Sequence, residues 1–124
     1  MSNVTELVDH YLAAWNERDA RRRRDLIAKT WTDDGSYVDP ARSGNGHDAI
    51  SAMIGQAQEN FPGVRLRLAG AIDAFGDRMR FRWEAIDEKG APIHLVGADF
   101  GVVANDGRLK SVTGFIDQTP VAVH

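Results

Sequence analysis

The sequence contains no cysteine, so it can form no disulfide, supply no thiolate nucleophile and hold no cysteine-ligated metal. No two of its four histidines have the spacing of a metal-binding pair, and we therefore expect neither a metal nor another cofactor. A glycine-rich phosphate-binding loop and a nucleophile elbow are also absent from the sequence. The motifs thus offer no sign of thiol, metal or nucleotide chemistry.

Long apolar runs are missing as well. No stretch approaches the roughly 18 apolar residues of a membrane span, and residues 1–6 lack the basic region and apolar run of a targeting signal. A formal net charge of −3 gives no electrostatic reason to expect nucleic acid as a partner. We expect a cytoplasmic protein that binds neither membrane nor nucleic acid.

The length and composition suit one domain spanning residues 1–124, with 43% hydrophobic residues to form a core. Apolar residues recur at helical spacing in three segments of the first half. We therefore expect amphipathic helices at about 3–16, 19–31 and 45–61, the first two capped by Asn3 and Asp19 and the third opened by Asn45 or Asp48. The four arginines of 21–24 would spread around the second helix and be solvated; a phosphate or acidic-partner site is the alternative.

After Gly63 the apolar period changes to two, which is typical of strands. We expect long strands at about 64–74, 78–87, 93–104 and 108–117, joined by short hairpins. A turn at 32–35, a short strand at 36–39 and a loop at 40–46 precede the third helix. Helices grouped before a meander predict an α+β fold, with three helices of the N-terminal half packed on a curved, mainly antiparallel sheet.

One face of that sheet carries charge rather than apolar side chains. Met79, Phe81 and Trp83 alternate with charged residues, and the charged face would include Arg65, Arg67, Arg80, Arg82 and Glu84. Such a face either forms a polar interface with a second subunit or is simply solvated. The residues leave both alternatives open.

Asp39 is the leading candidate for chemistry. In an extended chain Tyr37 and Asp39 share one face, looking into the space between helices and sheet. Asp-Pro is also a common turn starter, however, so the carboxylate of Asp39 could serve only as a local cap.

Asp99 and Tyr11 are the other candidate groups. Asp99 lies in a strand with two apolar faces, where a carboxyl must raise its pKa or acquire hydrogen bonds; it could instead be a satisfied hairpin or interface acid. Tyr11 lies on the buried stripe of the first helix, with its hydroxyl directed into the same space or merely placed at the rim of the core. We expect apolar side chains to line that space, namely Trp15, Trp31, Tyr37, Met53, Phe61, Phe81 and Trp83.

Several segments resemble the nuclear-transport-factor-2-like superfamily, and within it the SnoaL-like proteins, the group that also holds polyketide cyclases, ketosteroid isomerases and limonene-epoxide hydrolases. They are Tyr11-Leu-Ala-Ala-Trp-Asn, Asp33-Asp34-Gly35, Tyr37-Val38-Asp39-Pro40, Gly44 with Gly46, Gly97-Ala-Asp99-Phe, and Asp106-Gly107-Arg-Leu with Gly114-Phe115. The resemblance covers nearly the whole chain. It implies a cone-shaped α+β barrel, usually a homodimer, with a pocket between the helices and the concave sheet. We expect an apolar small molecule as the ligand and a homodimer formed through the sheet face.

The resemblance to ketosteroid isomerases also implies roles for three residues. Asp39 falls where those enzymes have their proton-shuttling base, Tyr11 where they have an oxyanion-donating tyrosine, and Asp99 where they have a protonated aspartic donor; a carboxylic acid kept neutral by an apolar site is known from that enzyme. The sequence departs from the pattern in a longer second helix region and in Gly101, which replaces a bulky residue. His94 and Asp117 are further candidates by similarity to polyketide cyclases, whereas the acidic and basic triad of the epoxide hydrolases has no counterpart.

Three functions are compatible with these residues. The first is a cofactor-independent isomerase or cyclase that transfers a proton beside a carbonyl, with Asp39 as base and Tyr11 and Asp99 as oxyanion donors. The second is a ligand-binding protein with the same pocket and no turnover. The third is a protein-interaction module acting through the arginine-bearing sheet face.

Overall fold

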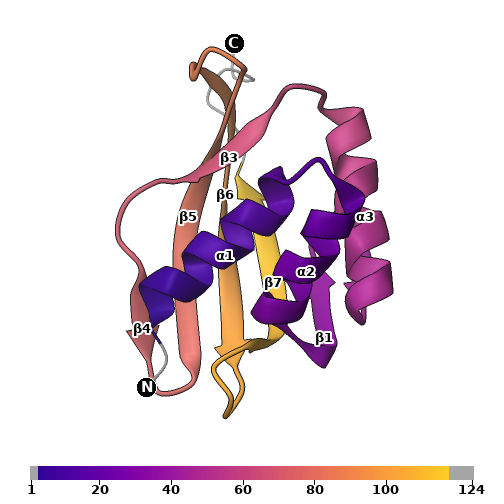
Figure 1. Cartoon of the computed structure of the whole chain (residues 1–124). Coiled ribbons are helices and arrows are strands. Elements are labelled where there is room, and N and C mark those ends of the chain that lie inside the picture. The colour runs from indigo at the N-terminus through magenta and orange to yellow at the C-terminus, as the bar shows by residue number, and fades with distance from the viewer. Residues whose placement is uncertain (1–2, 118–124) are drawn as a thin grey trace.

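The computed structural model describes residues 3–117, which form three helices on one face of a seven-stranded sheet. The helices are α1 (Val4–Asn16), α2 (Ala20–Thr30) and α3 (His47–Asn60). The strands are β1 (Trp31–Val38), β2 (Ser43–Asn45), β3 (Arg65–Leu68), β4 (Asp73–Phe75), β5 (Arg78–Ile86), β6 (Pro92–Val103) and β7 (Leu109–Asp117). In Figure 1 the helices lie in front of the sheet, α1 across its middle and α3 at one side. The predicted α+β fold is confirmed.

The sheet has the strand order β2-β1-β7-β6-β5-β3. β4 lies outside this order and pairs with β5 along the same edge as β3. Every neighbouring pair is antiparallel except β1 and β7, which run parallel; α3 and the other strands form the long connection that a parallel pair requires. Within residues 3–117 the end strands β2 and β3 do not pair with each other, so the sheet is curved but open. The space enclosed by this curve is where the helices pack.

Local signals placed the helices correctly. The side chain of Asn3 accepts a hydrogen bond from the Glu6 amide at 3.2 Å, and that of Asp19 accepts one from the Arg22 amide at 2.9 Å. These bonds satisfy amides that have no partner within the helix. α3 begins differently: Gly46 occupies the capping position with a φ of 85°, a left-handed conformation that favours glycine. Neither Asn45 nor Asp48 provides a side-chain cap.

Three strand predictions were wrong in detail. The expected strand at 64–74 is divided into β3 and β4 around Gly70, whose φ of 101° breaks the extended chain. The expected turn at 32–35 lies within β1, where the pairing register with β7 shifts between Trp31 and Ser36. Part of the expected loop at 40–46 pairs with β1 as β2. A partner distant in sequence, β7, therefore decides the conformation of 32–35, whereas a glycine conformation and a local pairing decide the other two cases.

The arginines of 21–24 do not form a uniformly solvated face, because Arg23 is only 7% exposed. Its guanidinium donates to the Ser51 hydroxyl, to the Glu17 carbonyl and to Gln58 Oε1 at 3.1–3.3 Å. Hydrogen bonds to neutral oxygens therefore make its burial between the helices tolerable. A helical period predicts that one residue in such a run faces inward, but it does not show that the inward residue is stable there.

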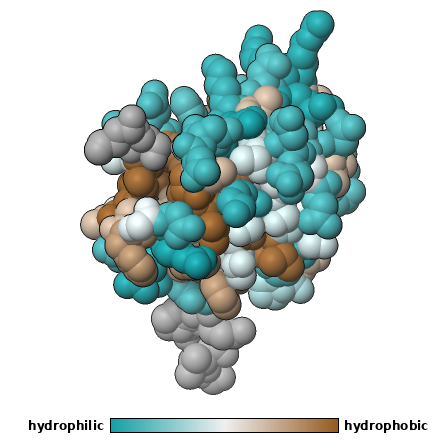
Figure 2. Space-filling model, turned by 90° about the horizontal axis from the view of Figure 1, so that it is seen from below, coloured by the Kyte–Doolittle hydropathy of each residue, from teal (hydrophilic) through white to brown (hydrophobic). Residues whose placement is uncertain are grey.

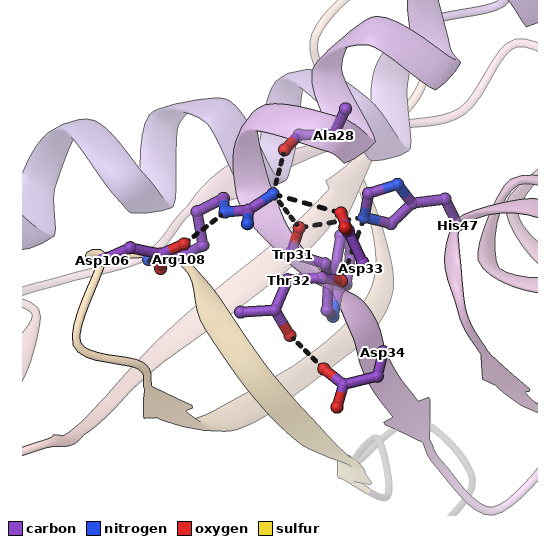
Figure 3. A network of polar contacts seen from close by, with 8 residues as sticks. All are labelled: Ala28, Trp31, Thr32, Asp33, Asp34, His47, Asp106 and Arg108. Atoms are coloured by element: carbon purple, nitrogen blue, oxygen red, sulfur yellow. Dashed lines mark hydrogen bonds and ion pairs between the residues drawn. The ribbon is translucent and has the colours of Figure 1, made fainter.

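A polar network joins the ends of four elements (Figure 3). Arg108, which follows the β6–β7 turn, donates to the carbonyls of Ala28 and Trp31 at 3.0 and 3.2 Å and to Asp106 at 2.9 Å. His47, at the start of α3, lies 2.9 Å from the Trp31 carbonyl. Carbonyls only accept, so His47 Nε2 carries the hydrogen. The end of α2, the start of β1, the start of α3 and the β6–β7 hairpin are fixed together.

The surface is not uniformly hydrophilic. Figure 2 shows apolar side chains gathered at the lower end of the molecule, the end at which Figure 1 places β4. Phe75 of β4 is 78% exposed. None of the helices in residues 3–117 is both long enough and apolar enough to cross a membrane.

We predict that Arg108→Ala lowers the free energy of unfolding by about 1–3 kcal/mol, because it removes a charged donor from the carbonyls of Ala28 and Trp31. Urea unfolding followed by tryptophan fluorescence measures this change. The matched control is Arg80→Ala, which breaks an exposed ion pair with Asp73 and should cost less than about 1 kcal/mol. Equal losses in the two variants would contradict the structural role of Arg108.

Candidate functional site

A cavity of about 120 Å³ opens between α1, α3 and the concave face of the sheet. Of the side chains predicted to line it, four do so: Trp15, Tyr37, Phe61 and Trp83. The other three, Trp31, Met53 and Phe81, pack in the hydrophobic core and are not among the lining residues. The period of a helix or strand gives the inward face, but it does not show which inward residues reach the open part of the interior. Leu66, Leu95 and Ile116 complete most of the apolar lining.

Asp99 of β6 is a carboxyl buried in this wall, with the whole residue 4% exposed. The Tyr11 hydroxyl donates to its Oδ2 at 2.6 Å and the Trp83 indole donates to its Oδ1 at 3.2 Å. Burial raises the pKa of Asp99 to about 6; the two hydrogen bonds oppose the rise, and the negative charge of Asp39 adds to it. Asp99 is therefore a group that changes protonation close to neutral pH.

Tyr11 contributes to the site through Asp99 rather than directly. It is fully buried on α1, is not among the cavity-lining residues, and directs its hydroxyl at Asp99. Burial, followed by the charge of Asp99, raises its pKa well above the ordinary tyrosine value. Tyr11 thus remains a proton donor that holds the Asp99 carboxyl in place.

Asp39 lines the cavity just beyond the end of β1, and its side chain is 3% exposed. Its Oδ1 accepts from the amides of Ala41 and Arg42 at 2.7 and 2.9 Å. Its Oδ2 accepts from the Tyr37 hydroxyl at 2.7 Å and from the Arg42 guanidinium at 3.2 Å. The two readings of Asp39 are therefore compatible: its carboxylate closes a local turn and also belongs to the cavity wall.

Gly114 of β7 shows how closely these groups converge. A Cβ atom at this position would lie 2.7 Å from the Tyr37 hydroxyl, 2.9 Å from Asp99 Oδ1 and 3.3 Å from Asp39 Cβ. Tyr11, Tyr37, Asp39 and Asp99 consequently form one continuous cluster. A glycine inside a strand often marks a close approach, so Gly114 was a weak signal of this position.

The wall formed by α1 is held by polar contacts that the sequence did not reveal. Gln58 of α3 donates to the carbonyls of Trp15 and Glu17 at 2.9 and 2.8 Å, while its Oε1 accepts from Arg23. Asn16 exchanges two hydrogen bonds of 2.8 Å with the backbone of Leu66. These contacts fix the end of α1 against α3 and β3.

The remaining candidates lie away from the cavity. His94 is exposed on β6, and Asp117 pairs with Arg82 at 2.8 Å on the outer sheet face. His47 belongs to the backbone network of Figure 3. A Cβ at Gly101 would lie 2.8 Å from Leu109 and from Met79, so this glycine serves core packing. Residues 3–117 contain no group of three or more acidic, histidine or cysteine side chains arranged to hold a metal ion.

We predict that Asp99 makes stability depend on pH. Its folded pKa of about 6 is raised above the unfolded value near 3.8, so its contribution is full below about pH 4 and is lost as pH rises through about 6. Between these limits wild type should lose up to about 3 kcal/mol of unfolding free energy relative to Asp99→Asn. Urea unfolding across this pH range measures the difference.

The control for this titration is Asp73→Asn, which alters an exposed carboxylate. Breaking its exposed ion pair with Arg80 should cost less than about 1 kcal/mol at every pH of this range. A difference between wild type and Asp99→Asn that does not change with pH would show that the buried carboxyl does not titrate as described.

Comparison with known proteins places the chain in a family. Residues 8–112 match the model of the SnoaL-like domain. A proposed isomerase of the SnoaL-like family from Agrobacterium tumefaciens is 40% identical, with a TM-score of 0.87 over 92% of this chain and 97% of that chain. An NTF2-like protein of unknown function from Exiguobacterium is 21% identical (TM-score 0.70; 91% and 99% covered), and a proposed polyketide cyclase from Sinorhizobium meliloti is 16% identical (TM-score 0.67; 88% and 93% covered). Comparison with curated proteins gives no significant match. The chain belongs to the SnoaL-like family.

Proposed function

We propose that this protein is a cofactor-independent isomerase or cyclase that transfers a proton at a carbon next to a carbonyl of an apolar substrate. The observation that carries the proposal is the meeting of two carboxyl groups, Asp39 and Asp99, in one largely apolar cavity. Their surroundings differ, since Asp39 is paired with Arg42 whereas burial raises the pKa of Asp99. Pairs of acids in different environments are suited to separate acid and base roles.

In this mechanism Asp39 is the base. It removes a proton from the carbon beside the carbonyl, and returning that proton to a different carbon completes an isomerisation with no net gain or loss of protons. The four hydrogen bonds to its carboxylate hold the group in one orientation. They also engage both of its oxygens, so one of these donors must lengthen its bond as the proton is taken up.

Asp99, in its protonated form, supplies the acid. A negative charge developing on the substrate oxygen raises the pKa of a neighbouring carboxyl further and favours the neutral, hydrogen-bond-donating form. Tyr11 holds that carboxyl from the side away from the cavity. The related structure from Agrobacterium, named as a proposed isomerase, supports this reaction class; the cyclase from Sinorhizobium supports only the fold.

The second candidate is a binding protein without turnover. It is favoured by the same four hydrogen bonds at Asp39, because donors of the protein already occupy both oxygens of the carboxylate. The cavity would then hold the same kind of apolar carbonyl compound. The two candidates differ in whether Asp39 exchanges a proton with the ligand.

We predict that wild type converts a β,γ-unsaturated cyclic ketone to its conjugated isomer, measured by ultraviolet absorbance, and that Asp39→Asn reduces kcat by roughly 100-fold or more. Tyr11→Phe, which removes the hydrogen bond from Tyr11 to Asp99, should reduce kcat less. Asp73→Asn is the matched control and should leave the rate unchanged. Binding of the ketone by wild type and Asp39→Asn without conversion by either would instead support the binding protein.

We also propose that two copies associate through the outer face of the sheet. Thr113 of β7 is paired with Val38 of β1 on one side and with Phe100 of β6 on the other. Phe115 lies two residues further along β7. These three apolar side chains are 37–58% exposed, Phe115 the most. The ion pairs Arg82–Asp117 and Arg67–Glu84 flank them on the same face. An apolar centre with a polar rim is typical of an interface.

Sedimentation velocity tests this association. We predict a dimer for wild type and a monomer for Phe115→Arg, because a charge would be buried without a partner at the centre of the contact. Ala28→Arg adds the same charge to the exposed side of α2 and should leave the dimer intact. A monomeric wild type at high protein concentration would favour the solvated sheet face.

A further inference from the structure

The cavity between the helices and the sheet is small for a ligand site. Its volume of about 120 Å³ is well below the roughly 300–1,000 Å³ of pockets that hold drug-sized molecules. An engineered apolar cavity of about 150 Å³ in another protein binds one benzene molecule. On this scale the cavity has room for one six-membered ring, and a second fused ring fits only if the walls move.

Trp83 limits the cavity on the side of the sheet. Its ring lies directly against Gly97 of the neighbouring strand β6, where even a Cβ atom would overlap it. Its indole N–H donates to Asp99 Oδ1 at 3.2 Å, which fixes the ring in this position. A bulky side chain therefore occupies the concave face next to the buried acid, and it cannot turn away without losing that hydrogen bond.

Leu66 of β3 limits the cavity near the edge of the sheet, where α1 holds the strand in place. The Leu66 side chain lines the cavity, and its backbone exchanges two hydrogen bonds of 2.8 Å with the Asn16 side chain. Gln58 ties the carbonyl of Trp15, another lining residue, to α3. Close-packed walls that are held by hydrogen bonds on several sides resist the expansion that a larger ligand would require.

The two acids lie in the buried part of the cavity, so the reacting end of a ligand must enter it fully. The side chain of Asp39 is 3% exposed and Asp99 is 4% exposed. Phe61 and Ile116 mark the open side, since they line the cavity and are 42% and 38% exposed. With one ring at the acids, the further rings of a polycyclic ligand would project past this opening. Small-molecule sites bury most of the ligand surface, whereas such a ligand would leave much of its apolar surface in water.

We propose that the substrate is a carbonyl compound with the bulk of a single six-membered ring, and that Leu66 is one of the residues that set this limit. The proposal rests on the proposed function for the position of the carbonyl, next to Asp39 and Asp99, but the size limit applies to any ligand of the cavity. Fused-ring ketones such as steroids lie outside this substrate class. Apolar ligands otherwise bind more tightly as their buried area grows, so the limit predicts a reversal of the usual order of affinity.

Isothermal titration calorimetry with three phenols of increasing size tests the limit on the full chain and requires no turnover. The probes are 4-methylphenol with one ring, 2-naphthol with two fused rings and the steroid phenol estradiol with four. Wild type should bind 4-methylphenol most tightly. The dissociation constants of 2-naphthol and estradiol should be higher by roughly tenfold or more, because overfilling a packed interior is unfavourable.

Two matched variants test the role of Leu66. Leu66→Ala shortens a lining side chain to one methyl group but keeps the backbone bonds to Asn16, and it should lower the dissociation constant of 2-naphthol roughly tenfold while changing that of 4-methylphenol less. Leu68→Ala makes the same change on the same face of β3, at a residue that packs against the core and is not among those lining the cavity. It should leave the order of the three phenols unchanged. Leu66→Val is the milder substitution if Leu66→Ala folds poorly, and the wild-type series is decisive by itself for the size limit.

The outcomes separate the size limit from the reaction. Affinity that rises from 4-methylphenol to estradiol in wild type, or binding of none of the three, would overturn the limit. Equal gains in 2-naphthol affinity for Leu66→Ala and Leu68→Ala would overturn the role of Leu66. A one-ring ketone that binds without being converted retains the limit and removes only the isomerase, whereas a steroid ketone converted faster than a one-ring ketone retains the isomerase and overturns the limit.

Discussion

The structure depends on the burial of one carboxyl group, Asp99, in an otherwise apolar wall. Such a group is tolerated only when donors from its surroundings reach it. Here they come from two layers, Tyr11 on α1 and Trp83 on β5, so the same hydrogen bonds that satisfy the acid also fix the distance between helix and sheet. The approach further requires Gly114, because any side chain there would occupy the place of the Tyr37 hydroxyl and Asp99 Oδ1.

The second acid, Asp39, is stabilised by different means. Its partners are two amides of its own turn, one hydroxyl and the Arg42 guanidinium, whereas within residues 3–117 Asp99 accepts from two neutral donors. The negative charge of Asp39 then contributes to the raised pKa of Asp99. One carboxyl is thus kept next to a positive charge and the other is made to hold its proton more tightly. Proximity alone would not separate their roles; the unequal surroundings do.

Much of this arrangement could be predicted from local signals, and the limits have a physical cause. Helix caps at Asn3 and Asp19 and the inward faces of the strands follow from spacing within a few residues. The meeting of Tyr11, Asp39 and Asp99 came only from the resemblance, since no local pattern relates residues up to 88 positions apart. The lining was predicted in part: Trp31, Met53 and Phe81 face inward but end in the core. Arg23 was misjudged because its burial depends on acceptors from α3 and from the connection after α1.

The buried arginine of α2 also reaches the cavity wall, through Gln58. Arg23 donates to Gln58 Oε1, and the amide nitrogen of Gln58 donates to the carbonyls of Trp15 and Glu17. The Trp15 ring lies between the rings of Tyr11 and Tyr37. An arginine that looks like surface charge in the sequence therefore helps to hold the end of α1 against α3. Side chains that line a site keep one geometry only when residues behind them are fixed in this way.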